Sequence, residues 1–147
     1  MNNDNVNYTK EDLVDHEAVS AIIQNKNNDI LILKHKKFGF WTVPMGKVDA
    51  SDSSLEMALK REIREEVGVF IKNYVGLGSF IREYERQGKI VTVIHHVYSV
   101  ISYNGVPTNI EEGKHSELRW IPMKDTTSLG DNISDAMRYI KRYFRIA

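Results

Sequence analysis

The hydrophobic positions in the middle of the chain repeat every four residues. This spacing places them on one stripe of an α-helix, and it predicts a helix over about residues 54–67. The four positions are Leu55, Leu59, Ile63 and Val67. Gly68 follows directly after the last of them and supplies a C-terminal stop.

The start of this helix has two candidate caps. Either Ser53 or Ser54 can accept a hydrogen bond from the unpaired backbone N–H groups of the first turn. Ser53 also stands three residues before Glu56, which is the spacing of a capping box. The sequence alone leaves both serines open as the cap.

Runs of apolar residues rich in β-branched side chains predict strands on both sides of the helix. Two precede it and are joined by a polar turn. Two long ones follow it and meet at a turn formed by Gln87 and Gly88, and a short one comes later. Their ranges are 17–24, 29–34, 69–84, 89–103 and 117–121.

A second helical stripe predicts a closing helix over residues 132–144. The stripe consists of Ile133, Ala136, Met137, Ile140 and Phe144. With 147 residues and 41% hydrophobic content, we expect one domain with a real core over residues 14–147. The polar residues 1–13 are expected to form a flexible N-terminal segment. Periodicity alone therefore predicts a mixed α and β domain.

Charge and composition narrow the classes of partner. The chain has 20 Lys and Arg against 20 Asp and Glu, so no global field recruits nucleic acid or an anionic membrane. No apolar run approaches the roughly 18 residues of a membrane helix, and the first residues lack the apolar core of a signal peptide. We expect a cytoplasmic protein. The absence of cysteine excludes thiolate zinc sites.

Three glutamates lie on and beside the apolar stripe of the central helix. At about 100° per residue, Glu62, Glu65 and Glu66 cluster on one side, with Glu66 inside the stripe. A solvated charge run is the alternative interpretation. However, like charges one turn apart destabilise a helix by about 0.2–0.5 kcal/mol per pair, and half-buried carboxylates are unfavourable when unpaired. A divalent cation resolves both problems, and all-oxygen ligands favour Mg²⁺ or Mn²⁺.

The residues around these glutamates resemble the Nudix box of the Nudix hydrolases, Gly-x5-Glu-x7-Arg-Glu-U-x-Glu-Glu-x-Gly-U, where U is aliphatic. The run from Arg61 to Val69 matches the second half of this motif at every position. The first half has one extra residue. Counting forward from Gly46 puts Asp52 at the leading acid position, whereas counting back from Arg61 puts Ser53 there.

The resemblance covers about residues 15–145. Residues 38–44 are similar to the family's aromatic approach to the box, although Pro44-Met45-Gly46 replaces the usual Pro-Gly-Gly. Residues 109–122 resemble a late loop and strand of many small nucleotide-cleaving members. The resemblance implies a Nudix-type α/β/α sandwich around a mixed β-sheet.

The resemblance also implies an activity, which is metal-dependent hydrolysis of a diphosphate linkage in a nucleoside diphosphate derivative. Within the family, the small size favours a MutT-like enzyme that converts a nucleoside or deoxynucleoside triphosphate to the monophosphate and pyrophosphate. ADP-ribose, dinucleoside polyphosphates, nucleotide sugars and capped RNA are the alternative substrates. A non-catalytic Nudix-fold nucleotide sensor is the alternative class. A homodimer, as in many relatives, and the number of metal ions stay open.

Each candidate site residue takes a role from this resemblance. The expected metal ligands are Glu62, Glu65, Glu66 and the backbone carbonyl of Met45. The general base is Glu62 or the late-loop acid Glu111, with Glu112 beside it, and Arg61 assists catalysis by orienting the carboxylates. The expected substrate contacts are Lys47, Phe40 and Trp41. The structural positions of the motif are Gly46, Gly68 and Asp52.

Overall fold

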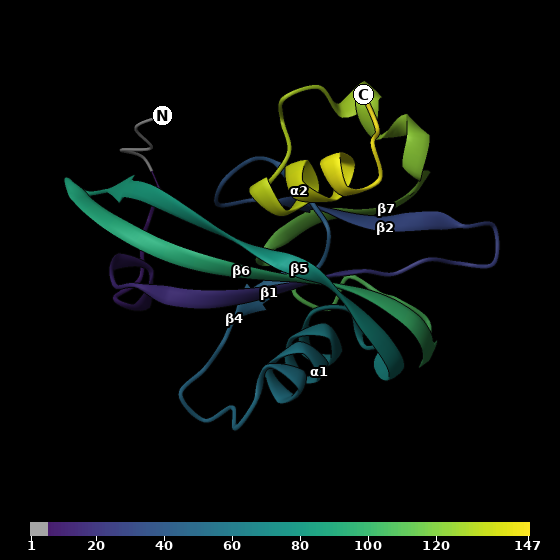
Figure 1. Cartoon of the computed structure of the whole chain (residues 1–147), viewed down its shortest axis with the longest axis horizontal. Coiled ribbons are helices and arrows are strands. Elements are labelled where there is room, and N and C mark those ends of the chain that lie inside the picture. Colours follow the sequence, from purple (N-terminus) through teal and green to yellow (C-terminus); the bar gives the residue numbers. More distant parts are fainter. Residues whose placement is uncertain (1–5) are drawn as a thin grey trace.

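The computed structural model describes residues 6–147, and its strands form two sheets between two α-helices (Figure 1). The order is β4-β1-β6-β5 in one sheet and β3-β2-β7 in the other. The strands are β1 (His16–Ile22), β2 (Asp29–His35), β3 (Trp41–Thr42), β4 (Met45–Lys47), β5 (Phe70–Arg86), β6 (Lys89–Asn104) and β7 (His115–Pro122). The helices are α1 (Leu55–Val67) and α2 (Asp135–Tyr143), and the short 3-10 turns are η1 (Glu11–Leu13) and η2 (Met123–Leu129).

The four-stranded sheet is mixed, as predicted. Strand β1 runs parallel to β6, with His16 opposite Val93 and Ile22 opposite Ser99. All the other pairings between named strands are antiparallel. The two helices lie on opposite sides of the sheets, with α1 below and α2 above in Figure 1. The predicted α/β/α sandwich is therefore confirmed, with its strands divided between two sheets.

Helix α1 begins and ends close to the predicted residues. The Ser54 hydroxyl accepts a hydrogen bond from the Met57 N–H at 3.1 Å, so Ser54 is the cap. Glu56 forms an ion pair with Lys60 instead of closing a capping box with Ser53, so that part of the prediction is wrong. Gly68 takes the left-handed conformation at φ 74°, which residues other than glycine adopt with strain.

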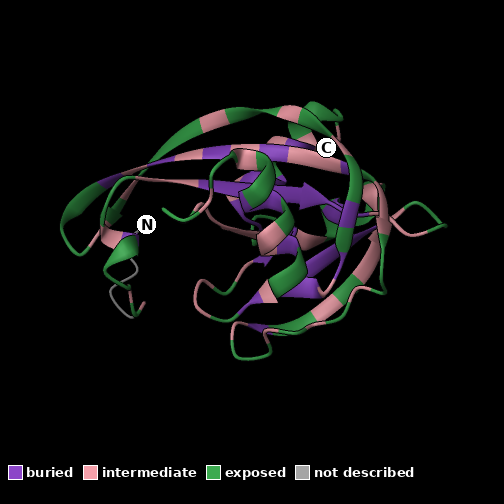
Figure 2. Ribbon diagram, turned by 90° about the horizontal axis from the view of Figure 1, so that it is seen from below, coloured by how far each residue is buried: buried purple, intermediate pink, exposed green. Residues whose placement is uncertain are grey.

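The long hairpin of β5 and β6 follows from its local sequence. Gln87 and Gly88 both have positive φ values, 53° and 75°, which matches the tight turn that connects two antiparallel strands. Strand β5 lies at the edge of its sheet. Most of β5 is exposed, whereas buried and intermediate residues alternate along the middle of β6. Figure 2 shows the buried segments gathered in the middle of the molecule.

The core has two main parts, one for each helix. Helix α1 contributes Leu59, Ile63 and Val67, each at most 1% exposed, to the first part. Helix α2 contributes Ala136, Met137 and Ile140 to the second. The helix ends at Tyr143, and Phe144 is 43% exposed, so the prediction that Phe144 continues the buried stripe is wrong.

Residues 9–13, ahead of β1, make contacts that the periodicities did not reveal. Residues 1–5 of the segment predicted to be flexible lie outside the described residues. Farther on, Glu11–Leu13 form η1, and Asp12 is only 3% exposed. Among residues 6–147, no helix is both long and apolar enough to cross a membrane.

The two serines at the start of α1 provide a matched test of this description. Ser54→Ala removes the hydroxyl that caps the helix, and we expect it to lower the free energy of unfolding by about 1 kcal/mol. Ser53→Ala should leave the free energy of unfolding unchanged within about 0.5 kcal/mol, because this exposed hydroxyl does not cap the helix. Urea denaturation of both variants measures the difference, and equal losses would contradict the assignment of the cap.

Candidate functional site

Strand β4 and helix α1 bring the two halves of the motif into contact. Gly46 in β4 lies directly against the Glu62 carboxylate of α1, and a Cβ atom at position 46 would overlap that carboxylate. Any residue other than glycine would therefore displace Glu62. This close approach explains the requirement for glycine at the first position of the motif.

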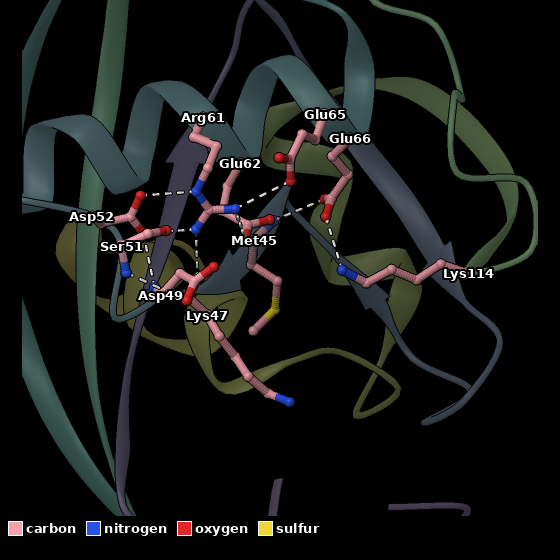
Figure 3. A network of polar contacts seen from close by, with 10 residues as sticks. All are labelled: Met45, Lys47, Asp49, Ser51, Asp52, Arg61, Glu62, Glu65, Glu66 and Lys114. Carbon is pink, nitrogen blue, oxygen red and sulfur yellow. Dashed lines mark hydrogen bonds and ion pairs between the residues drawn. The ribbon is translucent and has the colours of Figure 1, made fainter. Parts of the chain in front are cut away.

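Arg61 holds the loop before α1 against the helix (Figure 3). Its guanidinium donates to both carboxylate oxygens of Asp52, at 2.8 and 2.7 Å. It also donates to Glu62 at 3.0 Å, to Glu65 at 3.1 Å and to the backbone oxygen of Lys47 at 3.1 Å. The hydrogen bonds from Arg61 to Asp52 lower the pKa of that carboxyl group to about 2. Arg61 thus contacts three carboxylates at once, and its role of orienting them in catalysis stays a prediction.

The bidentate pair also identifies the leading acid of the motif. Asp52, with a side chain 2% exposed, is the residue that pairs with Arg61. It accepts a further hydrogen bond from the Asp49 N–H at 2.8 Å, which closes a turn ahead of the helix. This turn accommodates the extra residue between Gly46 and Arg61. Of the two alternatives, the forward count from Gly46 agrees with the structure.

Glu66 is the most deeply buried carboxylate of the site, at 1% exposure. Its oxygens accept hydrogen bonds from the Met45 N–H at 3.0 Å and from the Lys114 ammonium group at 3.2 Å. Burial raises the pKa of Glu66 to about 7, even though Lys114 and the Met45 N–H act in the opposite direction. Burial also raises the pKa of Glu62. Two neighbouring carboxylates therefore lack enough positive charge around them.

The donor chemistry of this pair fits a hard divalent cation. The Glu62 charge helps to raise the pKa of Glu66, and both side chains offer oxygen ligands of the kind that Mg²⁺ prefers. Glu65 is half exposed and turns toward Arg61. Across residues 6–147, no three His, Cys, Asp or Glu side chains form a preassembled metal cluster. The structure brings Met45 to the site through its N–H, and a role for its carbonyl stays a prediction.

A pocket of about 270 Å³ adjoins the Glu62 carboxylate. Phe38 and Phe40 form an aromatic part of its wall, with stacked rings 5.4 Å apart. Lys47 also lines the pocket, so two of the three expected substrate contacts, Phe40 and Lys47, are placed there. Trp41 is only 9% exposed and packs in the second core, with the Arg119 guanidinium 4.7 Å from its ring. The structure does not bring Trp41 to this pocket.

The late loop reaches the site through residues that the sequence reasoning missed. The backbone oxygen of Glu111 accepts hydrogen bonds from the N–H groups of Lys114 and His115, and this turn directs Lys114 toward Glu66. Burial acts to lower the pKa of Lys114, but the charges of Glu66 and Glu111 raise it overall, whereas Glu112 is exposed. No spacing rule separates Lys114 from other surface lysines, so only its place in the late segment could have indicated it.

His115 is the second residue that was missed. It is 1% exposed, and its Nε2 atom lies 3.9 Å from a Glu66 oxygen. Among the described residues, neither ring nitrogen has a hydrogen-bond partner. Burial lowers the pKa of His115 to about 4, so the ring is neutral at neutral pH and supplies no charge to Glu66.

Comparison with known proteins gives the same assignment as the geometry. A family model for the NUDIX domain matches residues 14–143. The chain is 27% identical to the MutT Nudix hydrolase of Burkholderia pseudomallei, with a TM-score of 0.75 over 87% of this chain and 96% of that one. It is 28% identical to the CTP pyrophosphohydrolase of Escherichia coli over 71% of this chain and 73% of that enzyme.

A vertebrate relative shows how widely the substrates of similar proteins vary. The chain is 35% identical to the asymmetrical bis(5'-nucleosyl)-tetraphosphatase of Mus musculus, over 60% of this chain and 60% of that enzyme. The match thus spans less than two thirds of the mouse enzyme. Since the family match covers most of the chain and the site carries the Nudix motif, the chain belongs to the Nudix hydrolase family, whose members act on phosphoanhydride bonds in nucleoside diphosphate derivatives.

Proposed function

We propose that the chain hydrolyses nucleoside or deoxynucleoside triphosphates to the monophosphate and pyrophosphate in a reaction that depends on Mg²⁺. The observation that carries this proposal is the composition of one pocket. Glu62 and Lys114 line it together with Lys47 and the aromatic pair Phe38 and Phe40. A carboxylate site, a basic group and flat rings match the phosphates and the base of a nucleotide.

The metal-binding residues of the proposal are Glu62, Glu65 and Glu66. A bound Mg²⁺ would neutralise part of the phosphate charge and would lower the pKa of a bound water molecule. Arg61 keeps Glu62 and Glu65 oriented, and the Met45 N–H and Lys114 hold Glu66. These contacts fix the carboxylates before substrate arrives, so little reorganisation accompanies binding.

Glu62 is the general base that we favour. Its carboxylate lines the pocket, and burial raises its pKa, which makes it a better proton acceptor. It takes the proton of the attacking water as the new oxygen–phosphorus bond forms and the bridging oxygen–phosphorus bond breaks. Glu111 remains the alternative base, acting from the turn that carries Lys114.

Lys47 and Phe40 complete the substrate contacts. An ammonium group at Lys47 suits a phosphate oxygen, and a purine or pyrimidine ring stacks on an aromatic wall with a free energy of about 1–3 kcal/mol. The likeness to the mouse tetraphosphatase favours dinucleoside polyphosphates as the second candidate substrate. Four acids are held here by Arg61 and Lys114, namely Asp52, Glu62, Glu65 and Glu66. A sensor that binds nucleotides without cleaving them would need none of these acids.

Product release from a substrate panel tests this proposal. We expect pyrophosphate from one group of triphosphates with Mg²⁺ or Mn²⁺, and no product with EDTA, because the acids need a cation to act on a polyanion. The panel includes dinucleoside polyphosphates, ADP-ribose, nucleotide sugars and capped RNA. Turnover of one of these groups instead would correct the substrate, and binding without turnover of any member would establish the sensor.

Glu66→Gln tests the metal assignment. The amide oxygen still accepts the Met45 N–H bond, so we expect the melting temperature to change by less than about 4 °C. The loss of a charged oxygen ligand should lower kcat by about a hundredfold or more. Glu56→Gln is the matched control, since Glu56 lies on the same helix in an exposed ion pair with Lys60, and its kcat should match the wild type. A wild-type rate in Glu66→Gln would show that Glu66 is not a ligand.

A further inference from the structure

The N-terminal strap, residues 8–13, closes one side of the nucleotide pocket with a carboxylate. Asp12 lines the pocket, is 3% exposed, and forms ion pairs with the ammonium groups of Lys37 and Lys47. The Thr9 N–H donates to the same carboxylate at 2.8 Å. Burial alone would raise the pKa of Asp12, but the two lysines lower it well below its ordinary value. The strap therefore brings a full negative charge into the pocket wall.

Three cations from separate parts of the fold meet around Asp12. Lys37 follows β2, Lys47 ends β4 and Arg86 ends β5, and all three line the pocket. Arg86 donates to the backbone oxygen of Asp12 at 2.8 Å, so it uses no carboxylate there. Within residues 6–147, Lys37 and Lys47 form ion pairs with Asp12 alone, and Arg86 forms none. One negative charge thus faces three positive charges.

The three cations carry more positive charge than the single Asp12 carboxylate neutralises, so they can bind a further anion. Gathering like charges in a partly buried place is unfavourable unless counter-charge is present. In Figure 3 the Lys47 side chain leads away from the carboxylates around Arg61, and its ammonium group pairs with Asp12 instead. A chain of phosphates is an anion that carries several charges.

The strap also presents an aromatic ring to the same surface. The Tyr8 ring lies 6.4 Å from the Phe38 ring, with the Lys37 ammonium 5.8 Å and the Arg86 guanidinium 5.5 Å from its centre. The strap therefore brings one anionic group into the pocket lining and places one flat ring beside Phe38, Lys37 and Arg86, which line the pocket. These are the two kinds of group that a nucleotide would offer to the same residues.

We propose that Lys37, Lys47 and Arg86 form a polyphosphate-binding subsite, and that the strap occupies this subsite as an internal competitor until an anionic ligand displaces Asp12. This proposal adds a regulatory feature to the proposed function. It rests on that function only in taking the bound polyphosphate to be part of a nucleotide. Binding of the polyphosphate to the three cations requires no turnover.

The size of the effect follows from competition. When a competitor occupies a site, only the molecules with a free site can bind the ligand. The apparent dissociation constant is then the intrinsic constant divided by the fraction of molecules whose site is free. If the strap occupies the subsite in about nine molecules of ten, removal of the Asp12 charge tightens anion binding by about tenfold. If the strap only held the lysines in place, removal of the Asp12 charge would instead weaken anion binding, because the lysines would be less well positioned.

The first experiment measures the binding of inorganic tripolyphosphate by calorimetry, with EDTA present so that no metal ion takes part. Asp12→Asn should bind tripolyphosphate about three- to tenfold more tightly than the wild type. The control is Glu11→Gln, which removes one charge from an exposed neighbour on the same strap and should bind like the wild type. Equal or weaker binding by Asp12→Asn would overturn the proposal.

Two further variants keep the test decisive if Asp12→Asn is unstable. Tyr8→Ala removes the ring that packs on Lys37 and Arg86 and so weakens the strap, while all three cationic residues remain in the chain. It should also tighten tripolyphosphate binding, by about two- to threefold. Lys37→Met in the otherwise unchanged chain should weaken binding relative to the wild type. Tighter or equal binding by Lys37→Met would remove it from the subsite and overturn the proposal.

The outcome separates this proposal from the proposed function. If tripolyphosphate binding responds to Asp12→Asn as expected while no nucleotide is hydrolysed, the subsite stands and the triphosphatase assignment fails. If triphosphates are hydrolysed but Asp12→Asn changes neither the binding of tripolyphosphate nor the KM, the assignment stands and the internal competitor is excluded.

Discussion

The Arg61 guanidinium is the interaction on which the geometry of the site depends. It joins the loop before α1, through Asp52 and the Lys47 backbone oxygen, to Glu62 and Glu65 on the helix. A planar group with five N–H donors can satisfy these partners simultaneously, whereas the single ammonium of a lysine cannot match the fork of the Asp52 carboxylate. The Glu66 bond to the Met45 N–H is a second clamp between β4 and α1. Together the clamps let Gly46 approach Glu62 closely.

This arrangement leaves the carboxylates unequally neutralised, and the inequality indicates where a cation belongs. Asp52 is so well paired that its pKa falls to about 2, whereas that of Glu66 rises to about 7. Glu66 therefore contributes stability below its unfolded pKa, and that contribution is lost as the pH rises through about 7. At neutral pH the fold carries a strained, partly charged site. A bound divalent cation would offset this strain, so stability and metal binding are coupled through the same side chain.

The elements that could be predicted from the sequence are those that local patterns determine. Helix α1 follows from a four-residue repeat and the glycine that ends it, and the long hairpin follows from two β-rich runs around Gln87 and Gly88. The parallel pairing of β1 with β6 and the division into two sheets join distant segments, and no local rule specifies them. Trp41 was misplaced for the same reason, because only the packing of α2 against β3 shows that its ring lies in the core.

The functional residues divide in the same way. Glu62, Glu66 and Arg61 could be located because one helix fixes their mutual spacing. Lys114, His115 and Asp12 could not, because each reaches the site across the fold from a loop, a strand start or a terminal turn.

Net charge was the least informative property, since a total of zero conceals a pocket in which Asp12 lies among three cations while Glu62 lies beside Arg61. This uneven distribution creates steep local differences in charge within the pocket. In the arrangement that we propose, a short polyphosphate would contact Lys37 and Lys47 through its free oxygens, and Glu62 would help to hold a divalent cation bound to it.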